Sequence, residues 1–199
     1  MSNRSNTAPS VALDARRALT SQLRSFVRDI PSAPCAWEEV DWNAAFAGAQ
    51  GDPRLAKLSG LLCDAPARVA DLRALWNESV ATSAFAWRLA PHLGADQQTS
   101  AIAGLLHRLG DMLTIRAIGT LEHVAGVRLD AASKADLCAE HSNELLERAV
   151  RDWGVPARAA AMAAAWRRLR DFPTAAADAA VVHLARFMAI ELVSPRMGA

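Results

Sequence analysis

Residues 103–111 read AGLLHRLGD and contain a histidine and an aspartate four residues apart within an apolar run. On an α-helix this spacing places His107 and Asp111 on one face. Both are candidate ligands for a divalent metal ion, but the residue that follows the histidine is Arg108. An inward-pointing arginine would bring a fixed positive charge toward a bound cation. The stretch therefore fits a metal site, the remnant of one, or an ordinary buried helix.

The helical pattern of this stretch continues along the chain. Apolar residues recur at intervals of three and four, and no stretch sustains the alternation of a half-buried strand. Helices are expected at 11–28 and 37–46, from a capping break at 51–53 through 62, and at 66–89, 96–118, 132–153, 156–170 and 174–193. Gly104 and Gly110 fall inside the helix over 96–118, where glycine is unfavourable, so they indicate close packing or a bend. We predict an all-α protein, a compact multi-helix bundle.

The length of 199 residues suits one domain with a full hydrophobic core. Residues 1–10 are polar and lack the apolar core of a secretory signal, so they are predicted to form a flexible tail. Residues 11–199 are expected to form a single helical domain. Within it we expect a front lobe over about 11–65 and a core over about 66–199.

The composition also indicates the compartment. The most apolar long segment, 172–193, is interrupted by Asp178, Arg186 and Glu191, which are costly in a bilayer. The cysteines stand far apart and form no CxxC pair, as expected of reduced core thiols: Cys35, Cys63 and Cys138. We therefore expect a cytoplasmic protein with no membrane span.

The net charge of +1 provides no overall field for binding nucleic acid or an anionic membrane. The basic run WRRLR at 166–170 places Arg167 and Arg170 on one helix edge near Trp166, a composition able to contact phosphate. One short cluster on a neutral protein is typical of a solvated face, so a nucleic-acid partner is not expected. The sequence also contains no Walker loop, nucleophile elbow, GxGxxG or HExxH motif.

Four segments, in this order and at these separations, resemble the HDOD domain, the HD-related output domain of bacterial signalling. They are LWNESVATSAFAWRLA at 75–90, AGLLHRLGD at 103–111, WGVP at 153–156 and AAVVHLARFMA at 179–189. The resemblance extends from about Asp52 to Val193. It implies a helical fold of the HD-domain type.

The resemblance also implies where a metal site would lie. The parent group, the HD phosphohydrolases, holds metal with histidines, an adjacent His–Asp pair and a later aspartate. Besides Asp111, the corresponding positions here are His107 and Arg108, Ser142 with His141 beside it, Trp166 and Arg167, and Arg186. Arginine has no lone pair to give and stays protonated, so it acts against metal binding. The resemblance therefore predicts a degenerate metal site, with no catalytic residue and no cofactor.

The function we favour is a non-catalytic bacterial signal-transduction or regulatory module that acts through protein–protein contacts. HDOD domains are often joined to receiver or cyclic-dinucleotide signalling domains, so the resemblance implies that such signalling proteins are partners in trans. The first alternative is a metal-dependent phosphohydrolase acting on a nucleotide or phosphate ester, with His107, Asp111 and His141 as surviving ligands.

A second alternative follows from the arginines at the former metal positions. If those positions meet in space, Arg108, Arg167 and Arg186 would converge on an anion such as a phosphate or a cyclic nucleotide. Salt bridges from these arginines to Asp111 or Glu140 would instead satisfy the new charges internally.

Overall fold

The computed structural model describes residues 36–46, 51–126, 128–166 and 176–193. Its elements are the 3-10 helices η2 (Trp37–Glu39) and η3 (Ala90–Leu93) and the α-helices α2 (Trp42–Phe46), α3 (Pro53–Cys63), α4 (Val69–Leu89), α5 (Gln97–Leu106), α6 (Leu109–Ala125), α7 (Ala131–Asp152), α8 (Ala157–Ala165) and α9 (Ala176–Val193). Every regular element in these ranges is a helix, which confirms the predicted all-α fold. The predicted tail over 1–10, the predicted helix over 11–28 and Arg167 lie outside the described residues.

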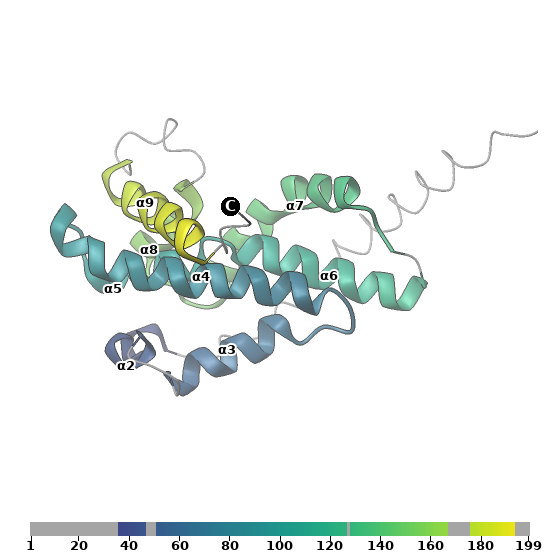
Figure 1. Cartoon of the computed structure of the whole chain (residues 1–199), viewed down its shortest axis with the longest axis horizontal. Helices are drawn as coiled ribbons and strands as arrows, with labels where there is room; N and C mark the ends of the chain where they lie inside the picture. The colour runs from purple at the N-terminus through teal and green to yellow at the C-terminus, as the bar shows by residue number, and fades with distance from the viewer. Residues whose placement is uncertain (1–35, 47–50, 127, 167–175, 194–199) are drawn as a thin grey trace, which may run out of the picture.

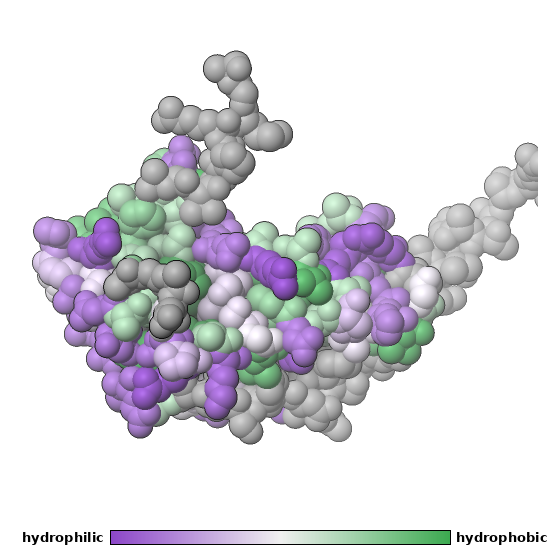
Figure 2. All heavy atoms as spheres, turned by 60° about the horizontal axis from the view of Figure 1, so that its bottom comes forward, coloured by the Kyte–Doolittle hydropathy of each residue, from purple (hydrophilic) through white to green (hydrophobic). Residues whose placement is uncertain are grey.

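Helix α4 runs through the middle of the molecule, with α3 on one side and α9 on the other (Figure 1). It packs most closely against α5 and α9, while α6 packs along α7 and α8 contacts α5, α7 and α9. Figure 2 shows one face of this bundle, where hydrophilic residues separate small apolar areas. Within the described residues, no helix combines the length and apolar character needed to cross a membrane.

Aspartates fix where several of the helices begin. Asp52, Asp96 and Asp130 precede α3, α5 and α7, and each carboxylate accepts a hydrogen bond from a backbone N–H of the first turn, at 2.7 Å in every case. Each bond satisfies an N–H group that has no partner within its helix. These caps explain why the predicted break at 51–53 and the predicted starts near 96 and 132 lie close to the observed helix starts.

The predicted helix over 37–46 is wrong, because the structure divides it into η2 and α2. Val40 is extended between them, and Asp41 caps α2 by accepting a hydrogen bond from the Ala44 N–H at 3.0 Å. Trp37 is buried and its indole N–H donates to the carbonyl of Trp153 at the end of α7, at 3.2 Å. This contact joins the first described segment to the main core.

The predicted single helix over 96–118 is also wrong, because α5 ends at Leu106 and α6 begins at Leu109. A Cβ on Gly104 would come within 2.9 Å of the Ser83 Cα in α4, and a Cβ on Gly110 would overlap the carbonyl oxygen of Ser142 in α7. The segment therefore approaches a different helix on each side of residues 107–108. The two glycines mark close packing on both sides of a bend, as the sequence indicates.

Helix α4 begins at Val69, later than the predicted start at 66, because Arg68 has a left-handed backbone with φ +64°. The Arg68 guanidinium donates to both carboxylate oxygens of Glu122 on α6, at 2.8 and 2.6 Å, and to the carbonyl of Leu129 at 2.7 Å. This buried ion pair fixes the start of α4 against α6.

Candidate functional site at the α5–α6 junction

The ring of His107 is buried at the bend between α5 and α6. Its Nδ1 lies 2.7 Å from the carbonyl oxygen of Gly104. A carbonyl accepts only, so Nδ1 carries the proton and satisfies one of the carbonyls left over at the end of α5. Burial lowers the pKa of His107 below its usual value, although the Glu78 carboxylate and the Gly104 carbonyl act in the opposite direction. At neutral pH the ring is therefore uncharged and caps a helix.

Trp166 fills the space beside this histidine. The residue follows α8 and is buried, and its indole N–H donates to the backbone carbonyl of His107 at 2.9 Å. The two rings meet edge to face, with centroids 5.0 Å apart and planes at 78°. Where the resemblance places a histidine ligand, the structure therefore has an aromatic side chain bonded to the junction.

Several predicted site residues surround one small cavity. Its lining residues are His107, Gly110, Asp111, Ser142, Asn143, Leu146, Ala163, Ala164 and Trp166. The cavity measures about 10 Å³, at the lower limit of about 10–15 Å³ that one water molecule needs. His141 is buried but does not line it, and its Nε2 lies 3.7 Å from Glu140. The structure thus places Ser142, and not His141, at the position that faces His107.

The arginines of the predicted anion site converge on a carboxylate of the protein. The Nε of Arg186 on α9 donates to Oε1 of Glu78 on α4 at 2.7 Å, and the Nε of Arg108 lies 3.9 Å from the same oxygen. Arg186 also stacks over the Trp166 ring, 4.8 Å from its centroid. Glu78 therefore occupies the position between the guanidiniums where an external anion was expected. The predicted third member, Arg167, lies outside the described residues.

Glu78 is the site residue that sequence reasoning missed. Burial alone would raise the pKa of its carboxyl, but the charges of Arg108 and Arg186 outweigh burial and lower the pKa to about 2. Glu78 is therefore ionised throughout the physiological range. It joins α4, α9 and the α5–α6 junction by charge.

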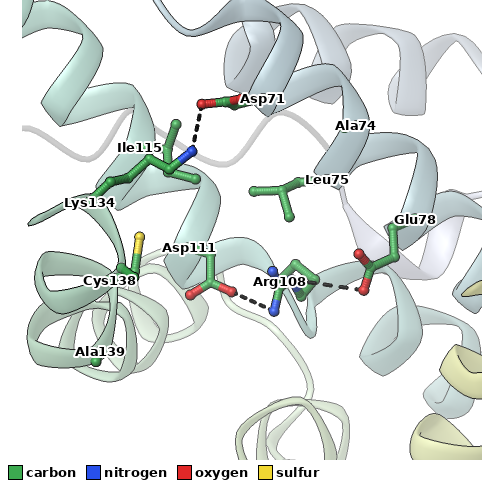
Figure 3. A pocket seen from close by; sticks show the side chains of 11 residues that line it. Asp71, Ala74, Leu75, Glu78, Arg108, Asp111, Ile115, Lys134, Cys138 and Ala139 are labelled. Carbon is green, nitrogen blue, oxygen red and sulfur yellow. Dashed lines mark hydrogen bonds and ion pairs between the residues drawn. The ribbon is translucent and has the colours of Figure 1, made fainter. Parts of the chain in front are cut away.

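Asp111 forms the second ion pair of the junction. Its carboxylate is buried and lies 3.0 Å from Nη1 of Arg108. Figure 3 marks this contact with a dashed line. Of the two internal partners considered for the arginines, Asp111 pairs with Arg108, whereas Glu140 lies beside His141. The candidate metal ligand of α6 thus faces a guanidinium.

These side chains, as they are arranged, do not fit a metal centre. Within the ranges that the structure describes, no three His, Cys, Asp or Glu side chains are grouped so that they could hold a metal ion. Trp166 and Arg186, at two positions where the resemblance implies ligands, present N–H donors to their neighbours. That an ancestral metal site was lost stays a prediction.

Replacing Trp166 with phenylalanine should lower the free energy of unfolding by about 1.5 kcal/mol, because the change removes the bond to the His107 carbonyl and leaves a void beside the ring. Urea titration followed by circular dichroism measures this loss. Trp76, which is only partly buried on α4, provides the matched control, and Trp76→Phe should lower the free energy of unfolding by a smaller amount. Equal losses would show that the indole N–H contributes nothing at the junction.

In the comparison with known families, residues 55–172 match the family model described as HDOD domain. The matched segment covers more than half of the chain and includes His107, Arg108, Ser142 and Trp166. It ends before α9, so Arg186 lies outside it. No curated protein and no solved structure matches the chain.

Proposed function

Because the chain belongs to the HDOD family, we propose that it is a non-catalytic signal-transduction module of the bacterial cytoplasm that acts through contacts with other proteins. Its partners in this proposal are separate signalling proteins, such as receiver proteins or proteins of a cyclic-dinucleotide pathway. The family match by itself relates the chain to the HD superfamily. The regulatory role goes beyond this match and is our proposal.

The packing of Trp166 against His107 carries this proposal. An HD-type hydrolase needs several ligands converging on metal-activated water. Here the indole and the imidazole touch each other, and the cavity between them and Ser142 measures about 10 Å³. A metal pair would have to displace the indole and break the Arg108–Asp111 contact. Such a junction supports a structural role for these residues.

The test is a joint measurement of metal content and hydrolysis. After incubation with Mn²⁺ or Ni²⁺ and dialysis, the protein should retain less than about 0.1 equivalents of metal per chain. It should also release no phosphate from a panel of nucleotides and phosphate monoesters. His183 is exposed on α9, so His183→Ala controls for metal held at surface histidines.

The phosphohydrolase alternative predicts the opposite result. Retention of about two metal equivalents, with turnover lost in His107→Ala and Asp111→Asn but kept in His183→Ala, would replace our proposal with that alternative. The anion-sensor alternative has less support, because Glu78 already pairs with Arg186 and lies near Arg108. Specific binding of a nucleotide or phosphate that is lost in Arg108→Ala would revive it.

A further inference from the structure

A cleft of about 530 Å³ opens beside the Glu78–Arg108 pair, between α4, α6 and α7 (Figure 3). This volume is typical of a site that accepts a ligand or the side chains of a partner. The lining residues are Asp71, Ala74, Leu75 and Glu78 from α4, Arg108, Asp111 and Ile115 from the α6 segment, and Lys134, Ala135, Cys138 and Ala139 from α7.

The cleft follows the helices. Its residues on α4 run from Asp71 to Glu78 and those on the α6 segment from Arg108 to Ile115, which is about two helical turns or about 10 Å in each case. Its exposed edges carry small side chains, namely Ala74 on α4 and Ala135 and Ala139 on α7. Such edges allow the backbone of another helix to approach closely, as in helix-in-groove recognition.

The middle of the cleft is apolar and each end is closed by an ion pair. At one end Lys134 Nζ lies 2.9 Å from Asp71, and at the other Arg108 Nη1 lies 3.0 Å from Asp111. Figure 3 shows the Leu75 side chain between these pairs. Because the charged groups already pair within the protein, the cleft favours an apolar side chain over a small molecule recognised by hydrogen bonds.

The charge of the cleft indicates the polarity of the partner. Within the lining the charges offset one another, because Asp71 pairs with Lys134 and Arg68, Glu78 pairs with Arg186, and Asp111 pairs with Arg108. The solvent-exposed face of α7 adds Asp136 and Glu140, which directly follow lining residues Ala135 and Ala139. The α7 edge of the cleft is therefore acidic, and a complementary surface is basic.

We propose that this cleft docks an amphipathic, basic helix of a partner protein. Apolar side chains of that helix would pack on Leu75, while lysines or arginines beside them would face Asp136 and Glu140. The inference rests on the proposed function, because it names the kind of partner that a non-catalytic module would contact, and the surface that it would use.

The first test uses the full chain and two fluorescent peptides of about 18 residues, one built of leucine and lysine with a helical apolar stripe and one with glutamate in place of lysine. Fluorescence anisotropy should show binding of the basic peptide, with an affinity that falls as NaCl is raised. The acidic peptide should bind at least about tenfold more weakly. Equal binding of both peptides, or of neither, would overturn the proposal.

Variants locate the binding. Ala139→Arg places a long cation at the cleft edge and should lower the affinity for the basic peptide at least about tenfold. The double variant Asp136→Lys, Glu140→Lys should lower this affinity by a similar factor. The matched control is Ala56→Arg, at an exposed position on α3, which should bind as the wild type does. Thermal melts of every variant confirm folding. An unchanged affinity in Ala139→Arg would place the peptide elsewhere and refute the assignment.

Cysteine alkylation gives a readout that does not depend on a variant. Cys138 lines the cleft, whereas Cys63 is a partly buried thiol on α3. The basic peptide should slow iodoacetamide modification of Cys138, measured by mass spectrometry, and leave the rate at Cys63 unchanged. Equal protection of both thiols would contradict a docking site in the cleft.

Two further outcomes distinguish the hypotheses. Self-association of the wild type that is abolished by Ala139→Arg would show that a second copy of the chain, and not a foreign helix, occupies the cleft. Metal-dependent turnover together with specific peptide binding would remove the proposed non-catalytic role and leave the docking site intact. If neither peptide binds specifically and no hydrolysis is detected, the docking proposal is refuted and the proposed non-catalytic function stands.

Discussion

Gly110→Ala should lower the free energy of unfolding by about 3 kcal/mol or more, or prevent folding altogether. The added Cβ would overlap the carbonyl oxygen of Ser142, which belongs to the backbone of α7 and cannot rotate away as a side chain would. Relief requires that α6 and α7 move apart along their whole contact. That movement would open the packing around Met112 and Leu145, which are buried in the same core.

Gly60→Ala is the matched control for this prediction. Gly60 also lies inside a helix, α3, but a Cβ there would meet no atom within 4 Å. The same change should therefore stabilise the protein by about 0.5–1 kcal/mol through helix propensity. Urea denaturation of both variants measures the contrast. If Gly110→Ala unfolds at the urea concentration of the wild type, α6 and α7 do not approach as closely as described.

The all-α fold can be predicted from local patterns in the sequence. Apolar spacing and the caps Asp52, Asp96 and Asp130 act within one or two turns, so they can be read without knowing the neighbours of a helix. The bend at His107 and Arg108 cannot be read in this way. No proline or glycine occupies the two positions, and the break depends on contacts of Gly104 with α4 and of Gly110 with α7.

The candidate site likewise contains residues that could be predicted from the sequence and one that could not. The resemblance places His107, Asp111, Ser142 and Trp166 among the former ligand positions, and in the structure these four residues line one cavity. Glu78 escaped notice because its main partner, Arg186, lies 108 residues away on another helix. A glutamate beside an apolar stripe is usually solvated. The neighbouring residue Ser79 is buried, and this was the one local feature that could have drawn attention to Glu78. The arginine that pairs with Glu78 is brought to it only by the tertiary structure.

Glu78→Gln should lower the free energy of unfolding by about 2 kcal/mol at pH 7. The amide keeps the shape of the side chain but removes the charge that offsets Arg186 and Arg108. A pKa lowered from 4.5 to about 2 corresponds to about 3 kcal/mol. Because the Glu78 side chain is 21% exposed, solvent screening reduces the expected loss to about 2 kcal/mol.

The pH dependence separates this effect from loss of packing. The folded-state pKa lies below the ordinary value, so the contribution of the carboxylate is fully present above about pH 4.5 and is lost as the pH falls toward 2. The difference in the free energy of unfolding between wild type and Glu78→Gln should therefore be constant from pH 5 to 7 and should disappear at acidic pH. Glu144→Gln, at an exposed position on α7, should stay within about 0.5 kcal/mol of the wild type throughout.

A difference that persists unchanged in acid would mean that Glu78 acts through shape and not through charge. A difference that disappears has a structural consequence, because the same carboxylate joins α4 to α9 through Arg186 and lies within 3.9 Å of Arg108. Its loss would leave Arg186, which stacks over the Trp166 ring, and Arg108 without the carboxylate that they share. Separation of α9 from α4 would then be the expected first step of acid unfolding, and faster amide exchange in α9 than in α6 at low pH would reveal it.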